Sequence, residues 1–290
     1  MTTAEQQFEH AVKTMHASPF SKLVKPGILR FLVRRWQRWQ GDGTRREARL
    51  FFGETMQVVL PEVVSEVIYT YGFFDEEVTR MVMDSVRPGD TVLDVGGHFG
   101  YVSLLCRHLA GEEGRVIAFE PTPSTFAILS ENLSRYRNAE AINVGMGRTP
   151  GELSIRDYGL RFCAWNTLAD DTRMPDVLAG VEPALHQVKI VCLDDVVAER
   201  GIAPDFIKVD AENFEYDVIA GAMDSIRRHQ PTVLLETGSE SSLRAGELLL
   251  ECGYEVHVCE VGGRTRRWEG SLPAANERYK DLLFIHASRH

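Results

Sequence analysis

The stretch TVLDVGGHFGYVSLL, residues 91–105, brings an acid, three glycines and a histidine together within a few positions. Asp94 follows a run of strand-forming residues, and Gly96, Gly97 and Gly100 come soon after it. Glycines at the end of a strand allow the backbone to turn sharply and to approach a ligand closely. An apolar helical pattern follows, and the start of a helix presents free N–H groups. The pattern predicts a nucleotide-binding turn.

The spacing of the glycines separates two classes of nucleotide cofactor. Dinucleotide folds use G-x-G-x-x-G with the pyrophosphate at the helix start, whereas this turn reads G-G-x-x-G. The carboxylate of Asp94 would repel a pyrophosphate, but it can pair with the ammonium group of S-adenosylmethionine. The order D-x-G-x-x-x-G is the form that S-adenosylmethionine-dependent methyltransferases use. The sequence therefore favours S-adenosylmethionine over a nicotinamide dinucleotide.

Two further residues belong to the same predicted site. Glu120 ends the next predicted strand, where a carboxylate can accept hydrogen bonds from two ribose hydroxyls. Both cofactor classes use such an acid, so Glu120 supports a nucleoside without choosing between them. His98 lies inside the turn, and its ring could bind the cofactor's carboxylate, bind the acceptor or brace the loop. Its ordinary pKa of about 6.5 also makes it a candidate catalytic proton shuttle.

A second set of acids follows the later predicted strands. Asp210 ends the segment DFIKVD, Glu212 comes two residues later, and Glu236 ends TVLLE. Because parallel strands bring their carboxyl ends to one edge, we expect these acids in the same crevice as the glycine turn. Asp210 is the first choice for a general base or an acceptor anchor, before Glu212 and Glu236. Crowded carboxylates can raise one pKa, which favours a base, or they can bind Mg²⁺, and the sequence leaves both open.

The elements that position these residues alternate between strands and helices. The predicted strands are 91–95, 115–120, 141–145, 205–210, 232–236, 254–260 and 281–287. Such alternation predicts an α/β fold with an open, mostly parallel, doubly wound sheet. Residues 150–190 look irregular, and we expect an insertion or loop region over one edge of the site.

The segment before the sheet has a different pattern. Residues 1–49 are predicted to be mainly helical, and 50–70 are predicted to form a short hairpin or two. Asp75 is predicted to cap a helix that ends at Pro88-Gly89. We therefore expect an N-terminal helical and β-hairpin extension over residues 1–72, followed by the main domain over 73–290.

A helix is expected within PGILRFLVRRWQRWQ, residues 26–40, with one apolar face. The face consists of Ile28, Phe31, Leu32, Trp36 and Trp39. We interpret it as a surface that docks on the main domain or on a second subunit, which would make a homo-oligomer. Contact with a membrane surface or with RNA are the alternatives.

Composition and charge exclude several classes of protein. The net charge is −10, with +6 in residues 1–50 and −16 in the remainder. An acidic main body repels phosphate backbones, so nucleic acid is a poor substrate. No apolar run approaches the roughly 20 residues of a membrane span, and no signal-peptide core is evident, so we expect a cytoplasmic protein. The five cysteines show no CxxC spacing, which argues for reduced thiols and against a disulfide framework or structural zinc site.

Four stretches of the chain, in order, resemble the FkbM-type family of S-adenosylmethionine-dependent methyltransferases. They are YGFFDEEVTRMVMDSVRPGD, DVGGHFGYVSLL, GRVIAFEPTPSTFAILSENL and LDDVVAERGIAPDFIKVDAENFEYDVIAGA. The resemblance covers residues 50–286. It implies the Rossmann-like class I methyltransferase fold, which has a seven-stranded sheet whose last strand is antiparallel. It also implies S-adenosylmethionine as the methyl donor and a hydroxyl on a sugar or natural product as the small-molecule acceptor.

The resemblance also implies roles for particular residues. By position, Asp94, Gly96 and Gly100 match the family's cofactor turn, and Glu120 matches its ribose-binding acid. The acids of the family's DVEGxE stretch correspond to Asp210, Glu212 and Glu215.

The chain departs from the family pattern at two places on the expected rim of the active site. Gly97 and His98 replace the Ala-Asn of DVGANIG, and Asn213 replaces a glycine. These departures leave the acceptor open. Asn213 also leaves room for a non-catalytic nucleoside-binding module. A nicotinamide-dependent oxidoreductase is the alternative enzyme class on this kind of sheet, although its glycine fingerprint is broken.

Overall fold

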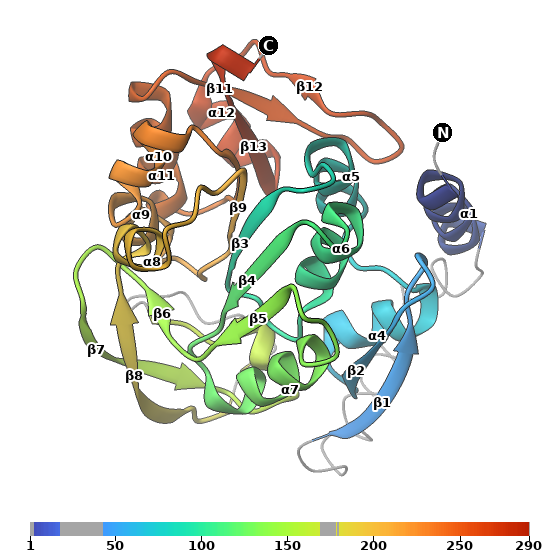
Figure 1. The fold of residues 1–290 in the computed structure, drawn as a ribbon. Coiled ribbons are helices and arrows are strands. Elements are labelled where there is room, and N and C mark those ends of the chain that lie inside the picture. Colours follow the sequence, from blue (N-terminus) through green and yellow to red (C-terminus); the bar gives the residue numbers. More distant parts are fainter. Residues whose placement is uncertain (1–2, 18–42, 169–177, 179, 290) are drawn as a thin grey trace.

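The computed structural model describes residues 3–17, 43–168, 178 and 180–289 (Figure 1). Its central sheet has the strand order β12-β11-β13-β10-β9-β3-β4-β5. The strands are β3 (Thr91–Val95), β4 (Arg115–Phe119), β5 (Ala139–Ile142), β9 (Phe206–Val209), β10 (Thr232–Glu236), β11 (Tyr254–Val258), β12 (Arg266–Arg267) and β13 (Asp281–His286). The strands from β5 to β10 are parallel, whereas β13 runs antiparallel to both β10 and β11. The predicted sheet with an antiparallel last strand is confirmed, and the short edge strand β12 makes eight strands instead of seven.

Helices cover both faces of this sheet, as Figure 1 shows. One face carries α5 (Glu76–Ser85), α6 (Tyr101–Ala110) and α7 (Pro123–Leu133), and the other carries α8 (Leu193–Arg200), α9 (Glu215–Ala220), α10 (Met223–His229), α11 (Glu240–Glu251) and α12 (Leu272–Arg278). Successive strand residues alternate between the two hydrophobic clusters, with Val92 in the first and Leu93 in the second. Because both faces are covered, the strands are apolar at nearly every position. The doubly wound class I methyltransferase fold is thus confirmed.

Two helices beside the sheet begin at the residues that favour a helix start. Asp75 caps α5, because its Oδ1 accepts hydrogen bonds from the backbone N–H groups of Glu77 and Val78, both at 3.1 Å. Pro123 occupies the first turn of α7, where its missing N–H costs nothing.

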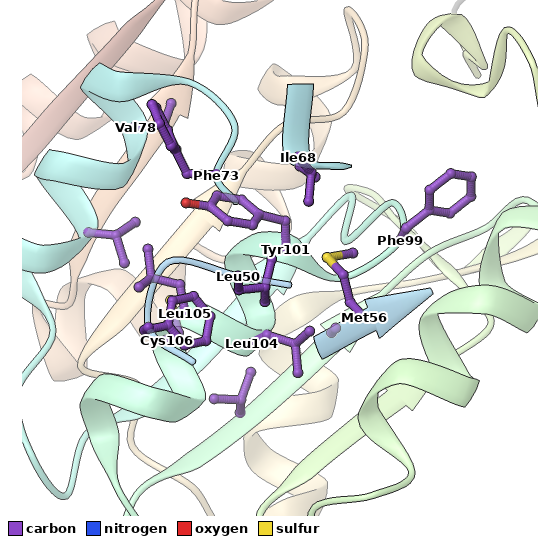
Figure 2. Close-up of a cluster of buried hydrophobic side chains, with 14 of the residues drawn as sticks. Leu50, Met56, Ile68, Phe73, Val78, Phe99, Tyr101, Leu104, Leu105 and Cys106 are labelled. Carbon is purple, nitrogen blue, oxygen red and sulfur yellow. The ribbon is translucent and has the colours of Figure 1, made fainter. Parts of the chain in front are cut away.

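The N-terminal elements share a core with the main sheet. The predicted helix and hairpin are present as α1 (Thr3–Ala17) and the antiparallel pair β1 (Thr44–Arg49) and β2 (Thr55–Leu60). The hairpin begins earlier than expected, because β1 lies in the segment that was predicted to be helical, and its mostly exposed side chains carry little of the apolar signal of a strand. Figure 2 shows Leu50 and Met56 from the hairpin segment near Leu104 of α6, within one hydrophobic cluster. Phe8 of α1 belongs to the same cluster. The boundary at residue 72 stays a prediction, and the predicted arginine-tryptophan helix lies outside the described residues.

The expectation of a second hairpin before residue 70 was wrong. Residues Val63–Tyr71 form a helix, α4, although they are rich in β-branched side chains. The carboxylate of Glu62 accepts hydrogen bonds from Val64 N at 2.9 Å and Ser65 N at 2.7 Å and so caps the helix. The cap and the burial of Ile68 outweigh the weak helix propensity of these residues.

The expectation that residues 150–190 are irregular was also wrong in part. They contain β7 (Gly151–Asp157), β8 (Ala184–Val191) and the 3₁₀ turn η1 (Cys163–Trp165). With β6 (Gly145–Met146) the two strands make a small sheet of order β6-β8-β7. Most side chains of β7 are exposed, so the strand carries little of the apolar signal by which a strand is recognised.

The remaining chain-wide expectations concern membranes and cysteines. Within the described part of the chain, every helix is too short or too polar to cross a lipid bilayer. All five cysteines are free thiols in the structure.

Candidate active site

A cavity of about 430 Å³ opens at the carboxyl ends of β3, β4, β9 and β10. This is the edge at which doubly wound sheets bind their ligands. The charged and reactive residues that line it are Asp75, Asp94, His98, Glu120, Cys163, Lys208, Asp210, Glu212, Glu236, Lys280 and Asp281. All of the sequence-predicted site residues except Gly100 and Glu215 therefore line one cavity. Gly100 is set back from the lining, at the start of α6.

The glycine turn is shaped mainly by its contacts with the rest of the protein. Gly96 has φ of 77°, and a Cβ atom there would lie 1.8 Å from the backbone oxygen of Asp210. A Cβ atom on Gly97 would approach Leu129 within 3.1 Å. Only glycine fits at position 96, because both the left-handed backbone and the close carbonyl exclude a side chain. The turn after β3 is therefore built directly against the end of β9.

Asp94 is fully buried, and one of its carboxylate oxygens accepts a hydrogen bond while the other has only a longer ion-pair contact. Ser103 donates a hydrogen bond to Oδ2, and Lys208 Nζ lies 3.9 Å from Oδ1. Oδ1 has no hydrogen-bond partner among the described residues. Burial raises the pKa of Asp94, although Lys208 acts to lower it. A buried acceptor without a partner is costly, so a cationic donor in the cavity would be stabilised there.

Glu120 is held by the backbone at the end of β4. Its Oε1 accepts a hydrogen bond from Thr122 N at 2.9 Å, and its Oε2 accepts one from His98 N at 3.1 Å. Burial raises the pKa of Glu120 to about 7, while these hydrogen bonds act to lower it. The carboxylate is thus fixed in orientation and lines the cavity beside the glycine turn.

His98 has a left-handed backbone, with φ of 48°, and its ring is half-buried in the cavity wall. The ring atom Nε2 lies 3.1 Å from Sγ of Cys163 in η1. Burial lowers the pKa of His98, although Glu62 and Asp210 act to raise it. The imidazole is therefore neutral at pH 7.

The acids after β9 and β10 form a second group on the other side of the cavity. Asp210, Glu212 and Glu236 each place a carboxylate oxygen within 4.8 Å of the other two. Buried Lys208 lies beside them, with Nζ 2.9 Å from Asp210 Oδ2. This carboxylate cluster, as we call Asp210, Glu212 and Glu236, holds three acids around one cation.

The electrostatics of the carboxylate cluster separate its members. Burial acts to raise the pKa of Asp210, but the charge of Lys208 and the hydrogen bonds from Glu236 and Lys208 together lower it. Burial and the negative charge of Asp210 raise the pKa of Glu212 to about 8 and that of Glu236 well above its ordinary value. The three pKa values are therefore shifted in opposite directions, lowered at Asp210 and raised at Glu212 and Glu236, as is common for acids at functional sites.

The turn that carries these acids explains one departure from the family pattern. Asn213 has φ of 76° and Glu212 has φ of 47°, both left-handed. Asparagine tolerates this conformation better than most non-glycine residues, so it can stand where a glycine is expected. Glu215 braces the turn, because its Oε1 accepts a hydrogen bond from Asn213 N at 2.9 Å. Glu215 supports the cluster and does not line the cavity.

Several residues of the cavity were not predicted from the sequence. Lys208 lies inside the apolar strand FIKVD, and a buried charge there requires a charged partner, which was a usable signal. Asp281 pairs in register with Glu236 because β13 is antiparallel. Burial and the charge of Asp75 raise the pKa of Asp281 well above the ordinary value. Cys163 and Trp165 come from the segment predicted to be irregular, where no pattern of residues pointed to the site.

The chain is similar to a known protein family. A family model described as the methyltransferase FkbM domain matches residues 94–256, more than half of the chain.

Two curated relatives are similar over part of their length. The 31-O-demethyl-FK506 methyltransferase FkbM of Streptomyces tacrolimicus is 33% identical over 164 residues, covering 48% of this chain and 62% of the relative. The hexuronic acid methyltransferase AglP of Haloferax volcanii is 23% identical over 155 residues, covering 53% and 58%. The chain therefore spans less than two thirds of these relatives.

Among solved structures, the methyltransferase FkbM of Methylobacillus flagellatus KT is similar to this chain with a TM-score of 0.45 and 16% identity. The match covers 72% of this chain and 50% of that chain.

Proposed function

This chain is a member of the FkbM methyltransferase domain family, and from that membership we propose that it methylates a hydroxyl of a small molecule. The methyl donor would be S-adenosylmethionine, and the acceptor a sugar or a natural-product intermediate. The curated relatives are named for a 31-O-demethyl-FK506 substrate and for a hexuronic acid, which supports an oxygen acceptor.

The observation that carries the proposal is the division of acids within one cavity. Asp94 and Glu120 lie at the ends of β3 and β4, whereas the carboxylate cluster lies at the ends of β9 and β10. A transferase moves a group from one substrate to another, so it needs two binding positions that border the same cavity. Holding both reactants in line is itself a large part of the catalysis of a displacement reaction.

The residues on the first side fit the donor. S-adenosylmethionine supplies an electrophilic methyl group on a sulfonium. Oδ1 of Asp94, which has no hydrogen-bond partner among the described residues, would accept a hydrogen bond from the donor's ammonium group. Glu120, already oriented by two backbone N–H groups, would accept hydrogen bonds from ribose hydroxyls. The turn of Gly96 and Gly97 leaves the backbone open to the cavity.

The residues on the second side fit an alcohol acceptor. A protonated alcohol is a weak nucleophile, so a positioned base assists its attack. We assign Asp210 this role, because it is the ionised member of the cluster and its carboxylate faces the cavity. Glu212 and Glu236 would hold the acceptor or relay the proton onward. His98, whose pKa is lowered and which also lines the cavity, is the remaining candidate base.

Mg²⁺ is the alternative occupant of the carboxylate cluster. Three carboxylate oxygens within 4.8 Å of one another suit a hard cation. Lys208, however, already brings a positive charge to 2.9 Å from Asp210, which lowers the attraction for a second cation. We therefore propose that the transfer does not require Mg²⁺.

Two measurements test the proposed function. Calorimetry of the full chain should detect binding of S-adenosylhomocysteine and no binding of NAD. Incubation with labelled S-adenosylmethionine and a panel of sugars, polyols and macrolide alcohols should yield a labelled ether, with the same rate in Mg²⁺ and in chelator. Binding of NAD alone would establish an oxidoreductase site instead. Binding of S-adenosylhomocysteine without transfer to any acceptor would favour a non-catalytic nucleoside-binding module.

A further inference from the structure

Three potential metal ligands meet in the cavity wall, apart from the carboxylate cluster. They are Glu62 before α4, His98 in the glycine turn and Cys163 at the start of η1. A carboxylate oxygen, an imidazole nitrogen and a thiol sulfur from these residues all lie within 4.8 Å of one another. Residues separated by 36 and 65 positions in the chain are thus brought to one point. His98 and Cys163 line the cavity, whereas Glu62 is fully buried and is not among the lining residues.

The spacing of these atoms is close to that of a tetrahedral metal site. His98 Nε2 and Cys163 Sγ are 3.1 Å apart. Zinc holds sulfur at ~2.3 Å and nitrogen at ~2.0 Å, which places the two ligand atoms about 3.5 Å apart in a tetrahedron. A shift of a few tenths of an ångström would therefore admit the ion between them.

The donor set selects the kind of metal. Sulfur, nitrogen and one carboxylate suit a borderline-soft ion such as Zn²⁺, whereas Mg²⁺ and Ca²⁺ prefer oxygen ligands. The carboxylate cluster offers the opposite set, three oxygens beside a lysine. The two groups would therefore discriminate between metals, even though they border the same cavity.

The charge at Glu62 supports a cation at this position. Its side chain is fully buried, and the hydrogen bonds that the structure describes for its carboxylate come from two neutral backbone N–H groups. Among the described residues, no lysine or arginine forms an ion pair with it. A buried carboxylate is best stabilised by a paired charge or a metal ion.

We propose that Glu62, His98 and Cys163 form a Zn²⁺ site in the wall of the cavity. Binding replaces the thiol S–H bond with a Zn–S bond, and the proton leaves to solvent. Three protein ligands leave the fourth position of a tetrahedral ion for water or for an oxygen of a molecule in the cavity. This site does not depend on the proposed methyl transfer. The CxxC pairs typical of structural zinc sites are absent from the sequence because these ligands come from three distant segments.

The experiment uses the full chain after dialysis against a chelator. Titration with Zn²⁺, followed by elemental analysis, should give one ion per chain. Co²⁺ in place of Zn²⁺ should produce the near-ultraviolet charge-transfer absorption of a thiolate ligand. Cys163→Ser should abolish that absorption and weaken Zn²⁺ binding by about 100-fold or more, and His98→Asn should weaken binding to a similar degree. Cys252→Ser is the matched control, because Cys252 is a half-buried thiol outside the cavity, and it should leave both measurements unchanged.

The unmodified chain provides a test that does not depend on the folding of the variants. Bound Zn²⁺ should protect Cys163 from alkylation, as peptide mass spectrometry would detect, while Cys252 should react equally with and without the ion. The proposal is overturned if the folded chain retains no Zn²⁺, if Co²⁺ binds without thiolate absorption, or if Cys163 is alkylated at the same rate in both states. In any of these cases the contact between His98 and Cys163 is a hydrogen bond that braces the loop.

Discussion

The two sides of the cavity hold their acids in different ways. On the side of β3 and β4, Glu120 is fixed by two backbone N–H groups, and Asp94 by a serine hydroxyl. On the side of β9 and β10, three carboxylates face one another around Lys208. Hydrogen bonds, mostly from the backbone, hold the acids on the first side. On the second side the carboxylate cluster lies close together beside the positive charge of Lys208.

This difference indicates a division of labour. Groups fixed by the backbone present the same shape to every ligand, as binding of an invariant cofactor requires. Buried carboxylates that lie close to one another have separated pKa values, as proton transfer requires. The sides meet at Gly96, where the turn after β3 contacts the backbone oxygen of Asp210. Three substitutions test this division, from the largest expected effect to the smallest.

The largest effect is expected from Asp210→Asn. The variant keeps the shape of the side chain but cannot accept a proton, so the rate of methyl transfer should fall by about 10²–10⁴. The affinity for S-adenosylhomocysteine should change little, because Asp94 and Glu120 are untouched. Steady-state rates, with and without chelator, and calorimetry measure the two quantities.

Asp224→Asn is the control for this experiment, since Asp224 is an exposed acid on α10. A melting curve of the Asp210 variant is also needed, because Lys208 loses its closest anion. Normal turnover by the folded variant, indifferent to chelator, would remove Asp210 from the chemistry. Glu212, Glu236 and His98 would then be tested in that order.

Gly96→Ala should disrupt the point at which the two sides meet. Alanine there would be strained at φ of 77° and would place its Cβ atom 1.8 Å from the backbone oxygen of Asp210. We expect a loss of roughly 2–4 kcal/mol in the free energy of unfolding, or roughly 5–15 °C in Tm. Differential scanning calorimetry measures both.

Gly89→Ala is the matched control for the steric part of this effect. Gly89 has φ of 90°, but a Cβ atom there would meet nothing within 4 Å. The Gly89→Ala variant should therefore show the backbone strain without the clash, and its free energy of unfolding should fall by about 1–2 kcal/mol. Equal losses at the two positions would mean that contact with Asp210 adds nothing.

Glu120→Gln should have the smallest effect and should alter cofactor binding alone. Removing the ionised acceptor of two ribose hydroxyls should cost about 1.5–3 kcal/mol, or roughly tenfold or more in affinity for S-adenosylhomocysteine at pH 8. The pKa of this carboxyl in the free protein is about 7. Below pH 7 the group is protonated, so affinity of the unmodified chain should fall by up to about tenfold for each pH unit.

Calorimetry from pH 5.5 to pH 8.5 checks this prediction. Above pH 7 the affinity of the unmodified chain should level off, because the carboxylate is then ionised. The variant should lack this inflection, since glutamine does not titrate. An identical inflection in both proteins would assign it to another group and would separate Glu120 from ribose binding.

The positions of the first acids could be predicted from the sequence because they depend on local patterns. An apolar strand that ends in Asp94 and a glycine turn, or in Glu120 before Thr122 and Pro123, is readable within a few residues. The rule that parallel strands end at one edge then places Asp210 and Glu236 nearby. The glycine spacing favoured the cofactor class, and the resemblance to a family agreed with it and supplied the antiparallel last strand.

The composition of the cavity wall depended on contacts that local patterns do not contain. Residues Val63–Tyr71 form a helix because Glu62 caps them, and the exposed strand β7 carries little apolar signal. Both segments reach the site, and they bring Glu62 and Cys163 to His98. No spacing in the sequence predicts this meeting, because the three residues lie on separate elements.

The sequence by itself determined the fold class and the acids at the ends of the parallel strands, because hydrophobic periodicity and turn residues act over short distances. Tertiary structure decided which other groups join those acids. Lys208 becomes their common cation only because β9 lies beside β3, with Lys208 in register with Asp94. Asp281 is the first residue of β13 and lies opposite Glu236 at the same edge of the sheet. It does so because an antiparallel strand begins where its parallel neighbours end.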